Sequence, residues 1–384
     1  MRSVALEASD ARTAEASTAP EAGSGRLVVQ AWLASRGLIL AVALLLAISS
    51  GRSLTDMVSN WDVQHFTNLA TGGYLAKPDG TLMAFFPGFP LLLHAGLLLG
   101  VPVAVTGVVL SLLGSAAAAA ALFRLGGPWA AVAWLFAPTA VFTTVPYTES
   151  LFCAAAFWAW ERARADRWLA AALLAQLACT VRVSGLFLLG ALFVMIVTRR
   201  DLSWSARGQR MAWLALPASV IATYAAYLYR LTGSWTAWYA AQSTGWARNL
   251  TWPWDSFANT VRAAAPGAFA DHPWWAEVFR AEMASMALGL VVTLWCLSRR
   301  MWAEASWVGV QVLAFSVSYW FFSVNRAVLL WFPLWIMLAQ WGSWRPRGAW
   351  LRVLHRVLAI LALTVSALLM MGWSWLFFTG KWAS

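Results

Sequence analysis

Hydrophobic residues form long stretches of this chain, and short polar stretches separate them. A helix needs about 20 predominantly apolar residues to cross a bilayer, and many of these stretches approach or reach that length. The candidate segments are 31–50, 83–99, 102–122, 128–143, 149–161, 168–181, 184–198, 211–229, 284–298, 304–323, 326–342 and 356–378. The pattern therefore predicts an all-α polytopic membrane protein with about ten to twelve transmembrane helices.

Composition agrees with that class. Of the 384 residues, 61% are hydrophobic and 11% are charged, whereas soluble domains carry about 25% charged residues. Cys153, Cys179 and Cys296 all lie in apolar runs, and their spacing is typical neither of a metal site nor of a disulfide framework. We interpret them as small core residues and expect no metal and no cofactor.

The formal charge of +11 could indicate a nucleic-acid partner, but its distribution favours another interpretation. Lys and Arg cluster in short runs between apolar segments, as they do in cytoplasmic loops. These runs are 161–167, 199–210, 299–300 and 345–356. We therefore expect no nucleic acid, and we place 51–82, 144–149, 182–184, 230–283 and 324–326 on the extracytoplasmic side.

That topology requires one irregular segment. If 83–99, 102–122 and 128–143 all crossed the membrane, residues 144–149 would lie on the cytoplasmic side. We expect 128–143 to be the broken or re-entrant one, because Gly126, Gly127 and Pro128 flank it and Pro138 interrupts it.

The N-terminal stretch differs from the rest of the chain. Residues 1–25 are rich in Ala, Ser and Glu and lack the apolar core of a signal peptide. We expect a disordered cytoplasmic tail over 1–28 and a membrane domain over 29–384, in a multi-pass protein of the plasma (inner) membrane.

Polar side chains gather on the predicted extracytoplasmic side. They are Asp56, Asp62, His65, Glu149, Arg182, Asn325 and Arg326, with the long loop 230–283. Ionisable residues near membrane segments are costly and are candidates for function. One extracytoplasmic site is therefore expected, rather than a path through the membrane.

Residues 59–71 predict a short interfacial helix in the first extracytoplasmic loop. Ser59 or Asn60 can cap its start, and Gly72-Gly73 can end it. Asp62 and His65 then share one face. Simpler interpretations exist: Asp62 as a first-turn acid that stabilises the helix dipole, His65 as a hydrogen-bonded interfacial residue, and Asp56 as a capping residue.

The same region carries a family resemblance. The matching residues are Trp61-Asp62, His65-Phe66, Gly73-Tyr74 and Phe85-Phe86-Pro87-Gly88-Phe89-Pro90, followed by PYTESLF (146–152), TVRVSG (180–185) and VNRAVLLWFPLW (324–335). In this order they resemble the phosphatidylinositol-glycan class V mannosyltransferases. One departure is Arg326-Ala327, where that family usually has Arg-Tyr, and it leaves the acceptor open.

The resemblance implies a GT-C membrane bundle that uses polyprenyl-phosphate-mannose as donor and a glycolipid or glycan as acceptor, among membrane lipids. It also implies that Asp62 is the catalytic base. The chemistry agrees, because glycosyl transfer from a lipid phosphate needs a base for the acceptor hydroxyl and positive charge for the departing phosphate. Arg182 and Arg326 can supply that charge, although each could also be an interfacial arginine.

Further residues are assigned around these. His65, Glu149 and Asn325 are expected at the donor and substrate, with helix-start capping as the alternative for Glu149. Acceptor contacts are expected from the aromatic-rich loops. The residues are Trp61, Tyr74, Asp271 and His272. Asp271-His272 is a weak metal pair without a third ligand, and the Trp residues of 230–283 could also lie on the membrane.

Two other functions fit a membrane protein of this kind. A lipid or polyprenyl-glycan flippase would carry polar groups at mid-bilayer in broken helices of matched halves, whereas here they gather on one side. A structural subunit of an envelope complex would need no clustered Asp62, His65 and Arg182. The sequence therefore favours a glycosyltransferase.

Overall fold

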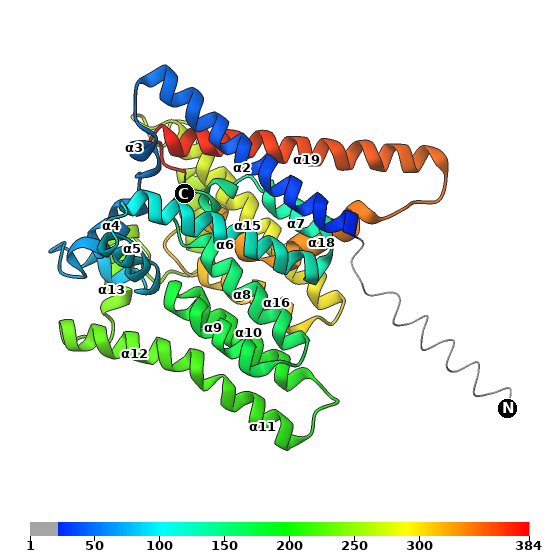
Figure 1. Cartoon of the computed structure of the whole chain (residues 1–384), viewed down its shortest axis with the longest axis horizontal. Coiled ribbons are helices and arrows are strands. Elements are labelled where there is room, and N and C mark those ends of the chain that lie inside the picture. The colour runs from blue at the N-terminus through cyan, green and yellow to red at the C-terminus, as the bar shows by residue number, and fades with distance from the viewer. Residues whose placement is uncertain (1–21, 384) are drawn as a thin grey trace.

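The computed structural model describes residues 22–383, and within them every regular element is a helix. The predicted all-α membrane fold is confirmed. Long helices run roughly along one direction, and short elements cover one end of the bundle (Figure 1). The long helices are α2 (Ala22–Ser50), α6 (Val103–Gly126), α11 (Trp204–Trp213) with α12 (Ala215–Thr232), α15 (Trp274–Ser298) and α19 (Ala349–Phe378).

Shorter helices complete the bundle and its covered end. Within the bundle are α7 (Pro128–Leu135), η2 (Ala140–Thr143), α8 (Glu149–Arg164), α9 (Trp168–Val181), α10 (Ser184–Thr198), α16 (Trp302–Ser316), η3 (Val328–Leu330) and α18 (Phe332–Ser343). At the covered end are α3 (Leu54–Val58), α4 (Asp62–Gly72), η1 (Thr81–Ala84), α5 (Gly88–Leu98), α13 (Ala237–Trp246), α14 (Pro253–Ala263) and α17 (Val324–Ala327).

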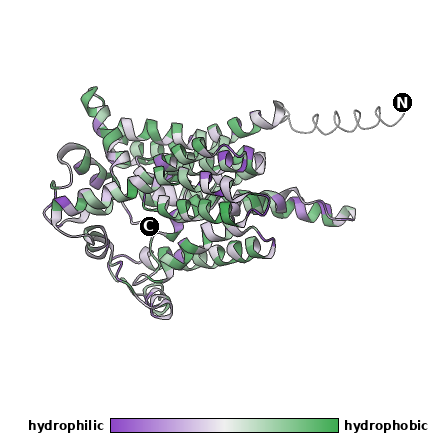
Figure 2. Ribbon diagram, turned by 90° about the horizontal axis from the view of Figure 1, so that it is seen from below, coloured by the Kyte–Doolittle hydropathy of each residue, from purple (hydrophilic) through white to green (hydrophobic). Residues whose placement is uncertain are grey.

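Five helices of the described chain are long and apolar enough to cross a membrane: Gly23–Ser50, Val103–Gly126, Trp204–Thr232, Trp274–Ser298 and Ala349–Phe378. Shorter apolar helices, including α9 and α10, have 10–17 residues. Hydrophobic residues cover most of the length of the long helices (Figure 2). These lengths and compositions fit a multi-pass membrane protein, while the expected number of ten to twelve crossings stays a prediction.

The two ends of the bundle differ. We call the end that carries α3, α4, α5 and α13 the site end. The basic runs lie in the α8–α9, α10–α11, α15–α16 and α18–α19 connections at the opposite end, which we call the basic end (Figure 1). Ion pairs from Asp166 to Arg199 (3.4 Å) and Arg210 (2.7 Å) join the first two of these connections.

The irregular segment predicted at 128–143 is broken as expected, since α7 ends at Leu135 and only the short η2 follows. This break alone does not place residues 144–149 on the same side as 51–82, which depends on segment 83–99. The segment 83–99 forms the 11-residue α5, about 17 Å long, which is too short for a hydrocarbon core of about 30 Å. Residues 83–99 therefore stay at the site end, and this corrects the parity of the crossings.

A buried arginine that the sequence did not single out supports the break. Arg36 of α2 donates hydrogen bonds to the carbonyl of Thr143 (3.2 Å) and to the hydroxyls of Thr143 (2.6 Å) and Thr144 (2.8 Å). Its second terminal nitrogen reaches the carbonyl of Leu135 at 3.4 Å. Broken backbone inside a membrane needs such donors, because lipid offers none.

Of three boundaries predicted near the N-terminus and at α4, two differ in the structure. Helix α2 already begins at Ala22, so the predicted tail is shorter than 1–28, and residues 1–21 lie outside the described residues. The residue before α4 is Trp61, which makes no side-chain capping bond, so the predicted Ser59 or Asn60 cap is wrong. The predicted end is right: α4 stops at Gly72, and Gly73 has φ of 70°.

Candidate active site

Asp62 is the first residue of α4, and the turn before it is held from the C-terminus. Asn60 donates through Nδ2 to the carbonyls of Met57 (2.9 Å) and Phe377 (2.8 Å). The indole of Trp61 donates to the carbonyl of Lys381 at 3.2 Å. Trp61 itself has φ of 56°, a costly value for a bulky residue. The Asp62 carboxylate is therefore set by contacts more than 300 residues away in sequence.

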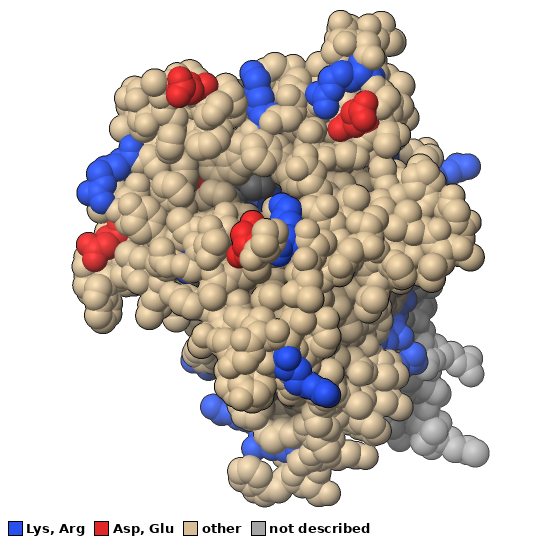
Figure 3. All heavy atoms as spheres, turned by 90° about the vertical axis from the view of Figure 1, so that its left-hand side faces the viewer, with Lys and Arg blue, Asp and Glu red and all other residues tan. Residues whose placement is uncertain are grey.

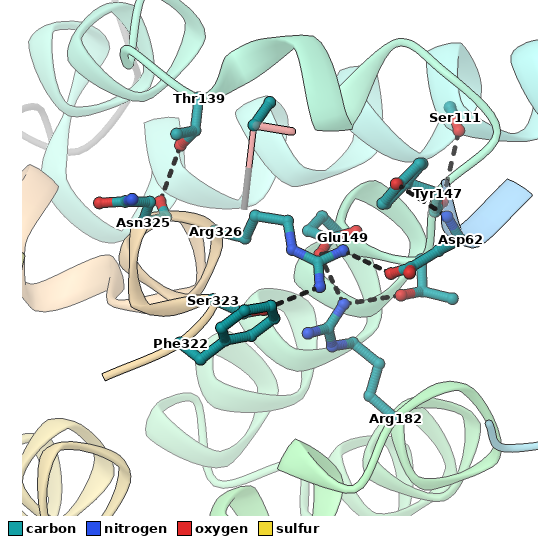
Figure 4. A network of polar contacts seen from close by, with 12 residues as sticks. Asp62, Ser111, Thr139, Tyr147, Glu149, Arg182, Phe322, Ser323, Asn325 and Arg326 are labelled. Carbon is teal, nitrogen blue, oxygen red and sulfur yellow. Dashed lines mark hydrogen bonds and ion pairs between the residues drawn. The ribbon is translucent and has the colours of Figure 1, made fainter. Parts of the chain in front are cut away.

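Asp62 forms a tight ion pair in the interior of the site. Its Oδ2 accepts from Arg326 Nη1 at 2.7 Å, and its backbone N–H donates to the hydroxyl of Tyr147 at 3.2 Å. The ring of Tyr147 also lies 5.3 Å below the Arg326 guanidinium. Among the described residues, Oδ1 of Asp62 makes no hydrogen bond, so one carboxylate oxygen is left for a substrate (Figure 4).

A second ion pair lies beside the first. Glu149, the first residue of α8, is fully buried, and its Oε1 accepts from Arg182 Nη1 at 2.7 Å. Arg182 also donates to the hydroxyl of Thr148 at 2.7 Å, and Arg326 lies 3.7 Å from Glu149 Oε1. The other oxygen, Oε2, has no hydrogen-bond partner in the described chain. Glu149 therefore holds both arginines in place rather than capping its own helix.

The short segment that carries Arg326 is anchored by an acid that the sequence did not single out. Glu282 of α15 is fully buried and accepts from the backbone N–H groups of Ser323 (2.9 Å) and Asn325 (3.0 Å). Ser323 needs such support, since its φ is 65°. The Asn325 side chain accepts from Ser285 at 2.8 Å, so it points into α15 and not toward Asp62.

Two cavities meet at Asp62. The smaller one, of about 90 Å³, is lined by Arg182, Arg248 and Arg326 together with aromatic and aliphatic side chains. The larger one has about 530 Å³. Asp62, Trp246 and Arg326 line both. Seen from the site end, the surface is hollowed, with sparse charged side chains around it (Figure 3).

Three guanidinium groups crowd the smaller cavity. Burial, and then the positive charges of Arg326 and Arg182, lower the pKa of Arg248 to about 10. Arg248 stays protonated at neutral pH, but it is held next to two like charges. An anion bound there would relieve this repulsion, and guanidinium groups match the geometry of phosphate oxygens.

The larger cavity has an aromatic wall. Its tryptophans are Trp61, Trp246, Trp275, Trp320 and Trp382. His65 also lines it, with Lys77 Nζ 3.3 Å from its Nδ1. Burial lowers the pKa of His65, although the Asp62 carboxylate acts in the opposite direction. His65 is therefore neutral at pH 7, with a ring nitrogen able to hydrogen-bond a polar ligand.

The structure separates the predicted site residues into two groups. Asp62, Trp61, His65, Arg182 and Arg326 line the cavities, and Glu149 lies directly behind them. Others do not line either cavity. Tyr74 is packed against Tyr224 and Tyr227, His272 stacks on Trp275, and Asp271 and Asn325 lie outside the cavity walls.

Sequence reasoning missed Tyr147, Arg248 and Glu282 as parts of the site. Tyr147 stands inside the PYTESLF motif and could have been found there. Arg248 and Glu282 lie in a Trp-rich stretch with no motif to mark them. Among the described residues, no group of three or more His, Cys, Asp or Glu could hold a metal ion.

The loop 230–283 has two kinds of tryptophan. Trp246 and Trp275 line the larger cavity, whereas Trp235, Trp252 and Trp254 are 64–66% exposed. The first pair is available to a ligand. The second set has the amphipathic position typical of indoles at a membrane interface.

Comparison with known proteins supports the motif resemblance. The chain is similar to GPI alpha-1,6-mannosyltransferase 2 of Mus musculus, with 36% identity over 154 residues. The Rattus norvegicus and Homo sapiens proteins of the same name share 35% over 159 and 32% over 154 residues. The matched region covers 35–36% of this chain and 31–32% of those proteins, so the match spans about a third of the length of these relatives.

Comparisons with family profiles and with solved structures give weaker results. No protein-family profile matches the chain. A crystal structure of ArnT from Cupriavidus metallidurans bound to undecaprenyl phosphate aligns with 89% of this chain and 75% of its own, at a TM-score of 0.45 and 16% identity. The resemblance to the phosphatidylinositol-glycan class V mannosyltransferases, first suggested by the motifs, is thus confirmed as a partial sequence similarity.

Proposed function

We propose that this protein is a GT-C membrane glycosyltransferase that transfers mannose from polyprenyl-phosphate-mannose to a lipid-linked or envelope glycan acceptor. One observation carries the proposal. Asp62 stands on the wall shared by two cavities, one rich in arginine and the other rich in tryptophan. A base between a phosphate site and a sugar site is the arrangement that glycosyl transfer requires.

The smaller cavity suits the donor phosphate. Arg182, Arg248 and Arg326 surround it, against a single lining carboxylate, Asp62. The guanidinium groups would bind the phosphate and stabilise the charge that grows on it as the bond to the sugar breaks. The apolar side chains of the same cavity, such as Phe66 and Phe86, offer a surface for the first part of the lipid.

The larger cavity suits the acceptor. Tryptophan faces stack on the apolar faces of sugar rings, while His65, Gln64 and Asp79 offer hydrogen bonds to hydroxyl groups. Aromatic side chains with a polar edge are well suited to ligands that are apolar on one side and wet on the other.

The reaction would proceed in one displacement. Asp62 accepts the proton of the acceptor hydroxyl as its oxygen attacks the anomeric carbon from the face opposite the phosphate. The bond from that carbon to the phosphate oxygen breaks, and polyprenyl phosphate leaves with the electron pair. Arg326 connects the two events, since a donor phosphate competes with Asp62 for Nη1 and frees the carboxylate to act as base.

The decisive experiment changes the proton acceptor alone. Asp62→Asn keeps the size of the side chain but removes its basicity, so kcat should fall by about 10²-fold or more while donor KM changes little. The assay uses purified enzyme in lipid with polyprenyl-phosphate-mannose and crude envelope acceptor. Asp56→Asn is the matched control, because Asp56 only forms a reciprocal cap with Ser53 and should be almost silent.

The same assay separates the proposal from a flippase. A flippase would move labelled polyprenyl-linked sugar across liposomes without forming a new glycosidic bond, so neither the wild type nor Asp62→Asn would form glycosylated product. Turnover of Asp62→Asn near the wild-type rate would instead make Asp62 a helix-start acid, and the base would have to be sought elsewhere.

A further inference from the structure

A second pair of cavities lies at the basic end, far from Asp62. One, of about 330 Å³, is lined by Arg345, Arg352 and Arg356. The other, of about 410 Å³, runs between α7, α18 and α19 and is lined almost entirely by apolar side chains. The two share Trp129, Gly342 and Arg356, so they are parts of one continuous groove with a basic mouth and an apolar floor.

The basic mouth has no internal counter-charge. Within residues 22–383, the guanidinium groups of Arg345, Arg352 and Arg356 make no hydrogen bond or ion pair, and no acid lines either cavity. In the sequence, the last Asp or Glu is Glu304. These three arginines therefore differ from Arg182 and Arg326, whose charges are offset by carboxylates.

The groove is held open by packing at its mouth. His355 of α19 is buried and hydrogen-bonded through Nε2 to the carbonyl of Trp341 in α18 at 2.9 Å. Its ring also packs against Trp344, with centroids 5.5 Å apart. Deeper in, the small side chains of Ala133, Ala339, Ala359 and Ala362 leave space between the helices.

Helix α19 leaves the apolar floor open to the bilayer. Among the five described spans it has the smallest buried share, 11%, against 22–33% for the others. Leu338 and Ile360, on opposite walls of the groove, are both exposed. A ligand with long apolar chains can therefore enter sideways from the membrane.

We propose that this groove binds an anionic glycerophospholipid, with its phosphate between Arg345, Arg352 and Arg356 and an acyl chain along the floor. Charge complementarity selects a phosphate, and the continuous apolar floor selects a lipid over a soluble anion. The site lies at the end that the sequence predicts as cytoplasmic, where anionic lipids attract basic segments. It is independent of the chemistry proposed at Asp62.

The test measures lipid binding directly. The full-length protein, purified in detergent, is titrated with phosphatidylglycerol, and bound lipid is counted by native mass spectrometry. Each arginine near an anionic lipid contributes roughly five-fold in affinity, so Arg345→Gln/Arg352→Gln/Arg356→Gln should bind about 100-fold more weakly. Ala362→Trp, which fills the floor without changing charge, should also weaken binding.

The matched control removes the same charge from the same end. Arg299→Gln/Arg300→Gln/Arg347→Gln alters three arginines that line neither cavity and should bind phosphatidylglycerol like the wild type. Equal losses in both triple variants would show general attraction to the basic end and overturn the proposal. So would binding of glycerol phosphate as tight as that of phosphatidylglycerol, or wild-type binding by Ala362→Trp.

Discussion

The two ends of the bundle use arginine in opposite ways. At the site end, Arg182 and Arg326 are largely buried and each lies 2.7 Å from a carboxylate. At the basic end, Arg345, Arg352 and Arg356 are exposed and have no acidic neighbour in the groove they line. A buried charge without a partner is very costly. Burying Arg182 and Arg326 at the site end therefore requires carboxylates beside them.

Paired and unpaired arginines are suited to different tasks. Paired buried charges hold side chains in one geometry, and they can exchange partners when a charged substrate arrives. Unpaired charges at the surface keep their whole attraction for an external anion, and their loss does not disturb the core. The site end is therefore suited to chemistry, and the basic end to orientation and to lipid binding.

The largest expected difference between the two ends is in thiol labelling from outside the cell, which should be all or none. In a variant with the three native cysteines replaced, Thr55→Cys and Ala268→Cys at the site end should react with an impermeant thiol reagent added outside intact cells. Ser205→Cys at the basic end should not. All three positions are exposed, and all should react after detergent solubilisation. Labelling of Ser205→Cys alone would place the site on the cytoplasmic side.

The next largest effect is expected when one arginine of a buried ion pair is truncated. Arg326→Ala and Arg182→Ala should each lower kcat/KM for the lipid-phosphate donor by about 30-fold or more, since truncating one partner of a buried charge pair costs about 2 kcal/mol or more. Replacement by Lys should rescue only part of this, because the bidentate geometry is lost. The measurement is initial rate against donor concentration.

A partly exposed arginine on the surface of the basic end, Arg199, is the control for these variants. Arg199 pairs with Asp166 and Asp201, but such surface pairs contribute about 0–1 kcal/mol. Arg199→Ala should leave donor kinetics unchanged. If Arg326→Ala and Arg182→Ala change donor kinetics as little as Arg199→Ala does, the buried arginines of the site end have no special role in donor use.

A smaller effect is expected at Glu282, which acts through the Arg326 segment. Glu282→Gln replaces one acceptor oxygen by an NH2 group, so either Ser323 or Asn325 loses the acceptor of its backbone N–H. The lost hydrogen bond should cost about 1–3 kcal/mol of stability. kcat/KM should fall several-fold at temperatures where the protein stays folded. Glu277→Gln, on the same helix but exposed, should affect neither quantity.

A double-mutant cycle distinguishes positioning from general destabilisation. If Glu282 acts by holding Arg326, Glu282→Gln should lower kcat/KM little further in an Arg326→Ala background. Full additivity of the two changes would mean that Glu282 affects activity by another route.

Much of the site was visible in the sequence because its residues stand in motifs next to apolar segments. Asp62, Glu149, Arg182 and Arg326 were named on that basis, and the structure brings all four together. Tyr74 stands in a motif too, yet it packs against Tyr224 and Tyr227. A motif position marks a residue as constrained, but it does not say whether the constraint is packing or chemistry.

Other residues could not be found from local pattern. Arg36 lies in an apolar run and Arg248 in a Trp-rich loop, and nothing near either of them in sequence shows what it contacts. Arg36 binds the broken segment more than 90 residues away. Such partners depend on how helices pack, which periodicity along one helix does not record.

The amino-acid sequence was enough to predict an all-α membrane protein, the approximate position of most of its helices, and which residues carry charge at each end, although single helix boundaries differ by up to about ten residues. These follow from short-range rules: apolar length, basic runs and helix-ending glycines. Four features became visible only in the folded chain. Residues 83–99 stay at one end, Glu149 contacts two arginines, Glu282 anchors the Arg326 segment, and a basic mouth continues into an apolar groove. Burying a charge or breaking a helix in lipid is tolerated only when a partner is supplied from elsewhere in the chain, and that partner is chosen by packing in three dimensions.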